Sequence, residues 1–268
     1  MDIGTAKPSL EQRRAIPHHL LDVADPDEPF DAAKYLQLAL PVIEDIRKRG
    51  HVPLVVGGTG FYMRVLTGGI CPGPSSDPEL KARLIADEKS KGLARLYSDL
   101  LRIDPESAAR IHPNDRQRIL RAVEVFELTG VALSVLQKGH GFKEKLFPSI
   151  KIFINREREV LFERIQRRVD SMIETGLKDE VERLLGMGYS TQVKPMQSLG
   201  YKQMSAHISG VLSLGEATRL IKQETRRYAK RQITWFRGDH EFRHFDADDI
   251  DGIYSYVARK ISGKAEAG

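Results

Sequence analysis

A glycine-rich turn that follows an apolar run is the first candidate for chemistry. Residues 52–56 read VPLVV, and Gly57-Gly58-Thr59-Gly60 comes directly after them. If the run is a strand of a parallel sheet, the turn presents backbone N–H groups and the Thr59 hydroxyl at the carboxyl edge, where α/β proteins bind ligands. Glycines also let a phosphate or a flat base approach the backbone closely. Taken alone, the pattern fits equally well a tight turn in which Thr59 caps a helix.

A basic segment near the carboxyl end is the second candidate. Residues 218–237 hold seven basic residues and one acid, a net charge of +6, whereas the whole chain carries +5, so the remainder sums to −1. Arg219, Lys222, Arg226 and Lys230 are spaced by three or four residues and share one helix face. Such a stripe suits nucleic-acid phosphates or a pyrophosphate. A solvated helix face is the alternative, but the segment lacks the alternating acids that would neutralise it.

Other chemistry-bearing residues give weaker signals. Gln117 and Arg121 share a helix face that could hold phosphates or base edges, although ordinary surface helices look the same. Trp235 and Phe236 could stack on a base, and we interpret them as core. The eight histidines have no partners at metal-ligand spacing, and neither a Walker A loop nor GxGxxG occurs in the chain.

The elements that must position these residues follow an α/β pattern in the first third. Residues 18–23 and 52–56 are predicted strands, the second of them buried on both faces. Between them, Asp31 caps a predicted helix that contains Pro41 and ends at Gly50. A further helix is expected after Gly60.

The middle of the chain changes character. Residues 71–76 are rich in helix breakers, and the pattern is helical from the Asp77-Pro78 cap to Gly130, with Asp115 capping the last helix. Strands are expected again at 151–154 and around 241–245, with helices between them. We therefore expect an α/β core with an inserted helical subdomain. Apolar spacing makes Leu220, Ile221, Tyr228 and Ile233 core-facing candidates of the basic helix.

Composition bounds the class of protein. The chain has 268 residues, 41% of them hydrophobic, which is enough for a packed core. One cysteine excludes an intramolecular disulfide. The longest uncharged stretch near the N-terminus is too short and too interrupted by glycine and proline to span a bilayer, and no secretory signal precedes it. We expect a soluble, reduced, cytoplasmic protein that acts without a membrane.

Six motifs in order resemble one family. They are MDIGTAKP, PHHLLDVADPDEPF, VPLVVGGTGFY, RIHPNDRQRILRAVEVFELTG, QSLGYKQM and TRRYAKRQITWFR. Together they cover nearly the whole chain and resemble the tRNA dimethylallyltransferase (isopentenyl-tRNA transferase) family. The resemblance implies a P-loop, nucleotide-kinase-like parallel sheet, associated with nucleotide and ATP binding. It implies a first core part at 1–70, a helical insertion at 71–145 and a second core part with RNA-binding helices at 146–268.

The resemblance also implies an activity. The family transfers a dimethylallyl group from dimethylallyl diphosphate to N6 of the adenosine 3′-adjacent to the tRNA anticodon (A37), giving N6-isopentenyladenosine, and Mg²⁺ assists departure of the diphosphate. The expected partners are therefore the tRNA anticodon stem-loop and dimethylallyl diphosphate, with the protein acting as a monomer.

Site residues are carried over by position. Thr59 matches the threonine at the reaction centre, and Gly57, Gly58 and Arg226 match the diphosphate site. The residues matched to tRNA contacts are Lys81, Gln117, Arg118, Ile119, Leu120, Arg121, Gln197, Ser198, Leu199, Gly200, Tyr201, Lys202, Lys230, Arg231, Gln232, Ile233, Thr234, Trp235, Phe236 and Arg237. No residue is assigned to a metal.

One part of the family pattern is missing from the printed sequence. Family members carry a GPTASGKS-type loop, followed by a helix, a strand and an Asp-Ser pair, before the MDIGTAKP motif. That unit holds the diphosphate-cradling loop and the general-base Asp, so we expect the chain as written to be a poor catalyst. Two other functions stay open at this point: a catalytically impaired tRNA-binding paralogue or fragment, and a P-loop phosphotransferase.

Overall fold

The computed structural model describes residues 1–142 and 144–265, and contacts divide the chain into two compact units. The first unit comprises Met1–Met63 and Ser149–Gly268, and the second comprises Arg64–Pro148. The second unit is thus inserted into the sequence of the first. Its bounds lie a few residues outside the expected insertion at 71–145.

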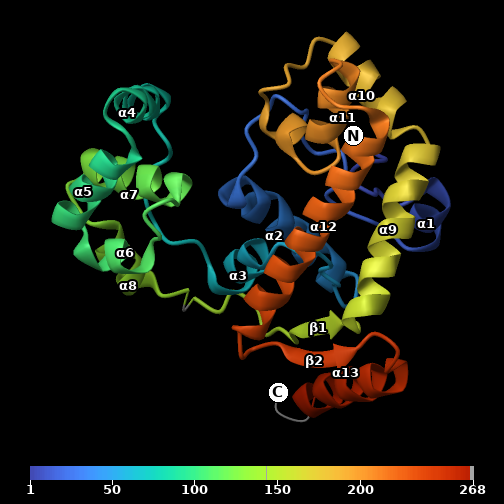
Figure 1. The fold of residues 1–268 in the computed structure, drawn as a ribbon. Coiled ribbons are helices and arrows are strands. Elements are labelled where there is room, and N and C mark those ends of the chain that lie inside the picture. Colours follow the sequence, from blue (N-terminus) through green and yellow to red (C-terminus); the bar gives the residue numbers. More distant parts are fainter. Residues whose placement is uncertain (143, 266–268) are drawn as a thin grey trace. The chain divides into compact units, whose positions relative to one another are not determined.

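Helices make up most of the first unit (Figure 1). In chain order its elements are α1 (Leu10–Ala15), α2 (Ala32–Lys48), the start of α3 (Gly60–Gly68), β1 (Ile152–Asn155), α9 (Arg158–Glu174), α10 (Leu177–Gly186), the 3₁₀ helix η1 (Lys194–Gln197), α11 (Tyr201–Ile208), α12 (Leu214–Arg237), β2 (Arg243–Asp246) and α13 (Ile250–Ala265). The Asp31 side chain caps α2, as expected, by accepting from the backbone N–H groups of Ala33 and Lys34. Helix α2 continues through Pro41.

A two-stranded parallel sheet joins the late part of this unit. Ile152 of β1 lies opposite Arg243 of β2, and Asn155 lies opposite Asp246. The long connection between the two strands contains α9 to α12, as a parallel pair requires. The strands expected at 151–154 and around 241–245 are confirmed as Ile152–Asn155 and Arg243–Asp246.

The core of the first unit is built by helices α9 to α12. Val169 of α9, Val181 of α10, Met204 of α11 and Ile221 of α12 are all buried in one apolar cluster. Helix α12 packs along α9 and α11. A Ser213–Glu216 capping box fixes its first turn. These contacts hold the basic helix by one face and leave the other face for solvent or a ligand.

The second unit is wholly helical within the described residues. It contains α4 (Pro78–Lys91), α5 (Leu93–Ile103), α6 (Pro105–Arg110), α7 (Arg116–Thr129) and α8 (Leu133–His140) around a core that includes Leu84, Leu100, Ile119 and Val123. Asp77 and Asp115 cap α4 and α7 as predicted, and Gly130 ends α7 in the left-handed conformation. Buried Asp104 accepts hydrogen bonds from the backbone N–H groups of Ser107 and Ser134, which links α6 to α8.

Two predicted strands are wrong. Residues 18–23 form no strand, because Leu20 and Asp22 adopt φ values of 60° and 56°, which interrupt an extended chain. Residues 52–56 pair with no strand among the described residues, and Leu54 and Val56 are 85% and 83% exposed. The run is as apolar as a buried strand, but in the described structure β1 and β2 pair with each other and not with it.

Two further expectations concern exposure. Ile221 is buried as predicted, whereas Tyr228 is 39% exposed and its predicted core position is wrong. Arg231, three residues further along α12, lies over the Tyr228 ring at 5.7 Å from the ring centroid.

Among the helices that the structure describes, none combines the length and apolar character needed to cross a membrane.

Candidate functional site

The glycine-rich turn lies against the last turns of α12. The Gly58 carbonyl accepts a hydrogen bond of 3.0 Å from the Gln232 side-chain amide. A Cβ on Gly60 would lie 2.2 Å from the Trp235 ring, so only glycine fits there without moving the ring. Packing against α12 thus holds the turn on both sides of Thr59.

Thr59 itself is exposed and directly precedes α3. Its carbonyl accepts from the backbone N–H groups of Tyr62 and Met63 at 3.0 and 3.3 Å. Its hydroxyl has no hydrogen-bond partner among the described residues. A Cβ added to the neighbouring Gly57 would lie 3.8 Å from the Met63 methyl carbon, an ordinary contact distance. The turn therefore holds the Thr59 hydroxyl in place and leaves it free to bind a ligand.

The basic residues of α12 differ in whether an acid accompanies them. Lys222 forms an ion pair of 2.6 Å with Asp170 of α9, and Arg227 forms one of 2.5 Å with Glu224. Arg226 and Lys230 have no ion-pair partner within the described part of the chain; both lie 5.8 Å from the ring centroid of Phe162 on α9. The predicted stripe is thus one helix face, but only part of it is available to an external anion.

Arg226 does not lie with the glycine-rich turn. The turn contacts Gln232 and Trp235, and Trp235 lies nine positions beyond Arg226 in a continuous helix. At 100° per residue these two side chains leave α12 on opposite sides. The geometry gives no support to a shared diphosphate site of Gly57, Gly58 and Arg226, which remains a prediction from the resemblance.

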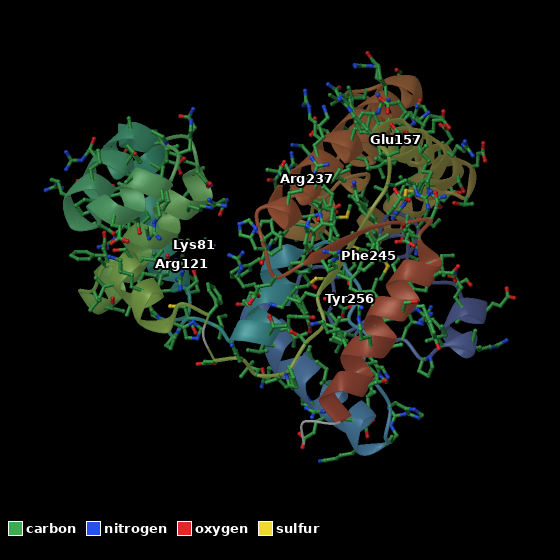
Figure 2. All side chains as sticks on the ribbon, turned by 90° about the horizontal axis from the view of Figure 1, so that it is seen from below. Lys81, Arg121, Glu157, Arg237, Phe245 and Tyr256 are labelled. Carbon is green, nitrogen blue, oxygen red and sulfur yellow. The ribbon has the colours of Figure 1, made fainter. Side chains whose placement is uncertain are left out.

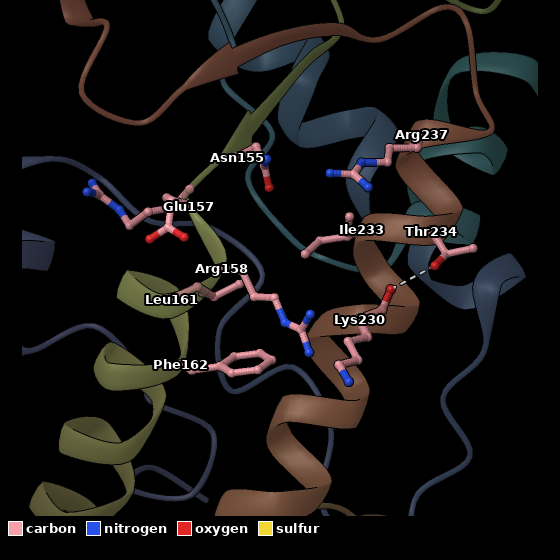
Figure 3. A pocket seen from close by; sticks show the side chains of 10 residues that line it. Asn155, Glu157, Arg158, Leu161, Phe162, Lys230, Ile233, Thr234 and Arg237 are labelled. Carbon is pink, nitrogen blue, oxygen red and sulfur yellow. Dashed lines mark hydrogen bonds between the residues drawn. The ribbon is translucent and has the colours of Figure 1, made fainter.

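A pocket of about 450 Å³ opens where β1 meets α9 (Figure 3). One wall is formed by residues 155–158 with Leu161 and Phe162, and the other by Lys230, Ile233, Thr234 and Arg237 of α12. Glu157 caps α9 by accepting from the backbone N–H groups of Glu159 and Val160. The first wall belongs to none of the six motifs, because its arginines lie in a segment with no recognisable spacing.

The segment 230–237 divides by burial. Lys230, Arg231, Thr234 and Arg237 are exposed, so they are free to contact RNA. Phe236 is 3% exposed and stacks on Phe153 with 5.0 Å between ring centroids. The core interpretation of the Phe236 side chain is confirmed. The assignment of Phe236 to the tRNA-contacting segment stays a prediction, which its buried side chain limits to the backbone. Gln232 and Trp235 contact the glycine-rich turn, and Ile233 lines the pocket.

The QSLGYK segment also divides. Gln197, Ser198 and Lys202 are exposed, while Leu199 is half-buried. Gly200 is buried with φ 89°, a backbone conformation that favours glycine. The Tyr201 side chain is fully buried in the core, so the predicted tRNA contact at this position, which stays a prediction, could involve only the backbone.

Glu180 is a structural side chain that belongs to none of the six sequence motifs. This buried carboxylate accepts hydrogen bonds from the backbone N–H groups of Asp2, Ile3 and Gly4, and from the Tyr201 hydroxyl at 3.0 Å. Burial and the negative charge of Glu180 raise the pKa of Tyr201, which keeps it a hydrogen-bond donor. A glutamate on the same helix face as Leu177, Val181 and Leu184 was the available signal. These bonds anchor the MDIGTAKP motif.

The second unit presents its predicted RNA contacts on α4 and α7. Lys81, Gln117 and Arg118 are exposed, and Figure 2 labels Lys81 and Arg121 in this unit. The Ile119 and Leu120 side chains are 0% and 5% exposed, so they pack in the core, and the matched tRNA contact of these two residues stays a prediction. Because α7 must pack its apolar face, only the polar residues of QRILR can reach a partner.

The Arg121 side chain forms hydrogen bonds within the protein. It donates to buried Glu124 at 2.8 Å and to the Pro74 carbonyl at 2.7 Å. Burial acts to raise the pKa of Glu124, but hydrogen bonds from Ser76 and Arg121 outweigh it and hold that pKa below its ordinary value. Arg121 therefore keeps a buried charge compensated whether or not it also binds RNA.

No group of three or more His, Cys, Asp or Glu side chains in residues 1–142 and 144–265 is arranged to hold a metal ion. Mg²⁺ is usually held by one or two carboxylates together with substrate phosphates, so its participation stays a prediction from the resemblance.

Comparison with known proteins decides the family. The family model described as IPP transferase matches residues 1–239. A tRNA dimethylallyltransferase of Syntrophobacter fumaroxidans is 54% identical over 260 residues, which cover 97% of this chain and 76% of the relative. This chain belongs to the IPP transferase family. The relative from Geobacter sulfurreducens, also a tRNA dimethylallyltransferase, is 48% identical over 98% of this chain and 85% of its own length.

Solved structures of the IPP transferase family agree. The tRNA isopentenylpyrophosphate transferase of Bacillus halodurans is 38% identical with a TM-score of 0.69, and the match covers 100% of this chain and 84% of that one. A eukaryotic dimethylallyltransferase, studied acting on tRNA, is 28% identical with a TM-score of 0.74 over 99% of this chain and 69% of its own. The coarse prediction of an α/β fold with many helices is confirmed.

Proposed function

We propose that this member of the IPP transferase family modifies tRNA by transferring a dimethylallyl group from dimethylallyl diphosphate to N6 of the adenosine 3′-adjacent to the anticodon. The observation that carries the proposal is Thr59, whose unpartnered hydroxyl is presented by a turn held against α12. The same helix carries exposed cations beyond that turn. We also propose that the core is a parallel sheet of the P-loop type and that the β1–β2 pair is part of that sheet.

The chemistry explains why positioning residues dominate the site. N6 of a stacked adenine is out of reach, so the base must leave the anticodon stack to react. An exocyclic amine is a weak nucleophile, and rate must come from alignment with the allylic carbon and from stabilising the leaving diphosphate. The new N–C bond forms as the C–O bond to the diphosphate breaks, and N6 loses one proton. The Thr59 hydroxyl can hold the amine or a diphosphate oxygen in line.

A transfer assay with chemical identification of the product tests this function. The longest reading frame that contains these 268 residues is incubated with labelled dimethylallyl diphosphate and an anticodon stem-loop carrying A37, and the digested RNA is analysed by mass spectrometry. The expected product is N6-isopentenyladenosine, absent with a G37 control. Binding without transfer would instead indicate a tRNA-binding paralogue. Transfer of the γ-phosphate of ATP to a small acceptor would indicate a phosphotransferase.

A further inference from the structure

We propose that the pocket between α9 and α12 binds a backbone phosphate of the tRNA, and that Arg158 on α9 is an RNA-binding residue. This inference rests on the proposed function. It extends the RNA interface from α12, which carries a family motif, to α9, which carries none of the residues matched to tRNA contacts. Figure 3 shows Arg158 extending from the α9 wall toward Lys230, with Phe162 beside them.

Cations gather around one aromatic ring in this pocket. The guanidinium of Arg158 lies 5.3 Å from the Phe162 centroid, and Lys230 and Arg226 both lie 5.8 Å from it. The ring face attracts positive charge, which holds the three side chains on its surface. Like charges so close together repel each other, and an anion bound between them would relieve that repulsion.

Among the described residues, no carboxylate forms an ion pair with these three cations. In the described residues Arg158, Arg226 and Lys230 form no ion pair, whereas Arg156 in the same wall is held by both carboxylate oxygens of Asp248 at 3.0 Å. The pocket carboxylate, Glu157, accepts hydrogen bonds from the first backbone N–H groups of α9. The Nε atom of Arg226 is buried without a hydrogen-bond partner. The cluster is therefore a binding site for an external anion.

A phosphate is the anion that matches these donors. A guanidinium donates in a fixed fork that fits two phosphate oxygens, and an ammonium adds a point charge from the other wall. RNA is the source that we favour, because Lys230, Thr234 and Arg237 line the pocket and belong to an exposed segment resembling an RNA-contacting motif. The Phe162 ring and Ile233 add apolar surface suited to a ribose or a base.

A salt titration of tRNA affinity tests the proposal. Arg158→Gln is expected to flatten the slope of log affinity against log salt by about 0.7 to 0.9, the value for one neutralised phosphate. Arg158→Lys, which keeps the charge, is expected to retain the slope. Arg167→Gln is the matched control: it removes the same charge from the opposite side of α9, nine residues away, where Arg167 pairs with Glu163 at 3.0 Å.

A second measurement separates the two phosphate sources. The KM for dimethylallyl diphosphate is determined for the same variants in the longest reading frame that contains this chain, and we expect Arg158→Gln to leave it unchanged. A raised KM with an unchanged salt slope would overturn RNA as the ligand and assign the donor diphosphate instead. No change in either quantity, or an equal slope change in Arg167→Gln, would overturn the pocket as a phosphate site.

The two proposals fail in distinguishable ways. If the unaltered protein binds tRNA but transfers no prenyl group, the salt slope still measures the Arg158 contact, and only the proposed reaction is lost. If transfer proceeds normally and Arg158→Gln behaves like its control, the reaction stands and the pocket proposal is lost. Thermal melting of each variant confirms that the exposed substitutions leave the fold intact.

Discussion

At the scale of single residues, Thr59 and Glu180 show two ways in which packing makes a polar group useful. Thr59 has its hydroxyl unpartnered because the surrounding turn is already anchored through Gly58 and Gly60. Glu180 is the reverse case, a carboxylate whose oxygens are occupied by backbone N–H groups of the first residues and by Tyr201. The first is placed to bind a ligand, and the second to hold a motif.

Thr59→Ala is expected to lower the rate of prenyl transfer far more than tRNA binding. The loss of one hydrogen bond made in the transition state costs about 2–4 kcal/mol, or roughly 30- to 1,000-fold in rate. Single-turnover kinetics measure it. Thr59→Ser should recover most of the rate, and Thr218→Ala, which removes an exposed hydroxyl bonded to the Leu214 carbonyl, serves as control. An unchanged rate in Thr59→Ala would show that Thr59 has only a structural role in the turn.

Tyr201→Phe is expected to destabilise the protein by about 1.5–3 kcal/mol, because it removes a buried hydrogen bond to a charged group. Urea unfolding measures the change. Glu182→Gln on the same helix as Glu180 is the control, since Glu182 forms only a surface ion pair of 3.0 Å with Lys178 and should shift stability by less than about 0.5 kcal/mol. Equal effects of the two substitutions would contradict a structural role for the Glu180–Tyr201 pair.

At the scale of elements, the basic residues on one face of α12 differ in whether an acidic side chain already pairs with them. Lys222 forms an ion pair with Asp170 of α9, whereas Lys230, two turns further along α12, lines the pocket. Helix α7 shows the same division by burial, since its polar residues face solvent and Ile119 and Leu120 face the core. In both helices, packing decides which members of a sequence motif reach a partner.

Lys222→Gln is expected to leave the salt slope of tRNA binding nearly unchanged, because Asp170 already compensates that charge. Lys230→Gln should flatten the slope by about 0.7 to 0.9. Fluorescence anisotropy across a salt series compares the two, with the apparent melting temperature measured in parallel. Equal slope changes for the two variants would show that the ion pair seen here opens when RNA binds.

At the scale of the whole molecule, the apolar segment 52–56 is exposed although its sequence is typical of a buried strand. It is the most apolar run near the glycine-rich turn, and Val52 and Leu54 are 70% and 85% exposed. Contiguous exposed apolar residues on a soluble domain mark a surface that another element or partner covers. In the described structure it has neither a strand nor a helix over it.

Leu54→Lys is therefore expected to change the stability of this chain by no more than about 0.5 kcal/mol, as for any exposed site. Leu100→Ala, at a position with 0% exposure, should cost about 2–5 kcal/mol and is the positive control. Chemical denaturation provides both values, and light scattering should show less self-association for Leu54→Lys. A large loss of stability in Leu54→Lys would mean that the segment is covered in solution.

The amino-acid sequence alone determined where several helices begin. Asp31, Asp77 and Asp115 cap helices as predicted, because a cap depends on hydrogen bonds within a few residues. The ordered motifs also determined the family, since each is a local string of residues. Local interactions and local patterns are fully present in the sequence.

Only the tertiary structure decided which residues of each motif are free to act. The run 52–56 reads as a buried strand, yet a strand exists only where another strand accepts its hydrogen bonds. Tyr201 and Ile119 stand inside motifs matched to RNA, but both are buried. Arg158 belongs to no motif and meets Lys230 only because α9 packs along α12. Burial and charge pairing depend on contacts between distant parts of the chain, and no spacing within a single segment reveals them.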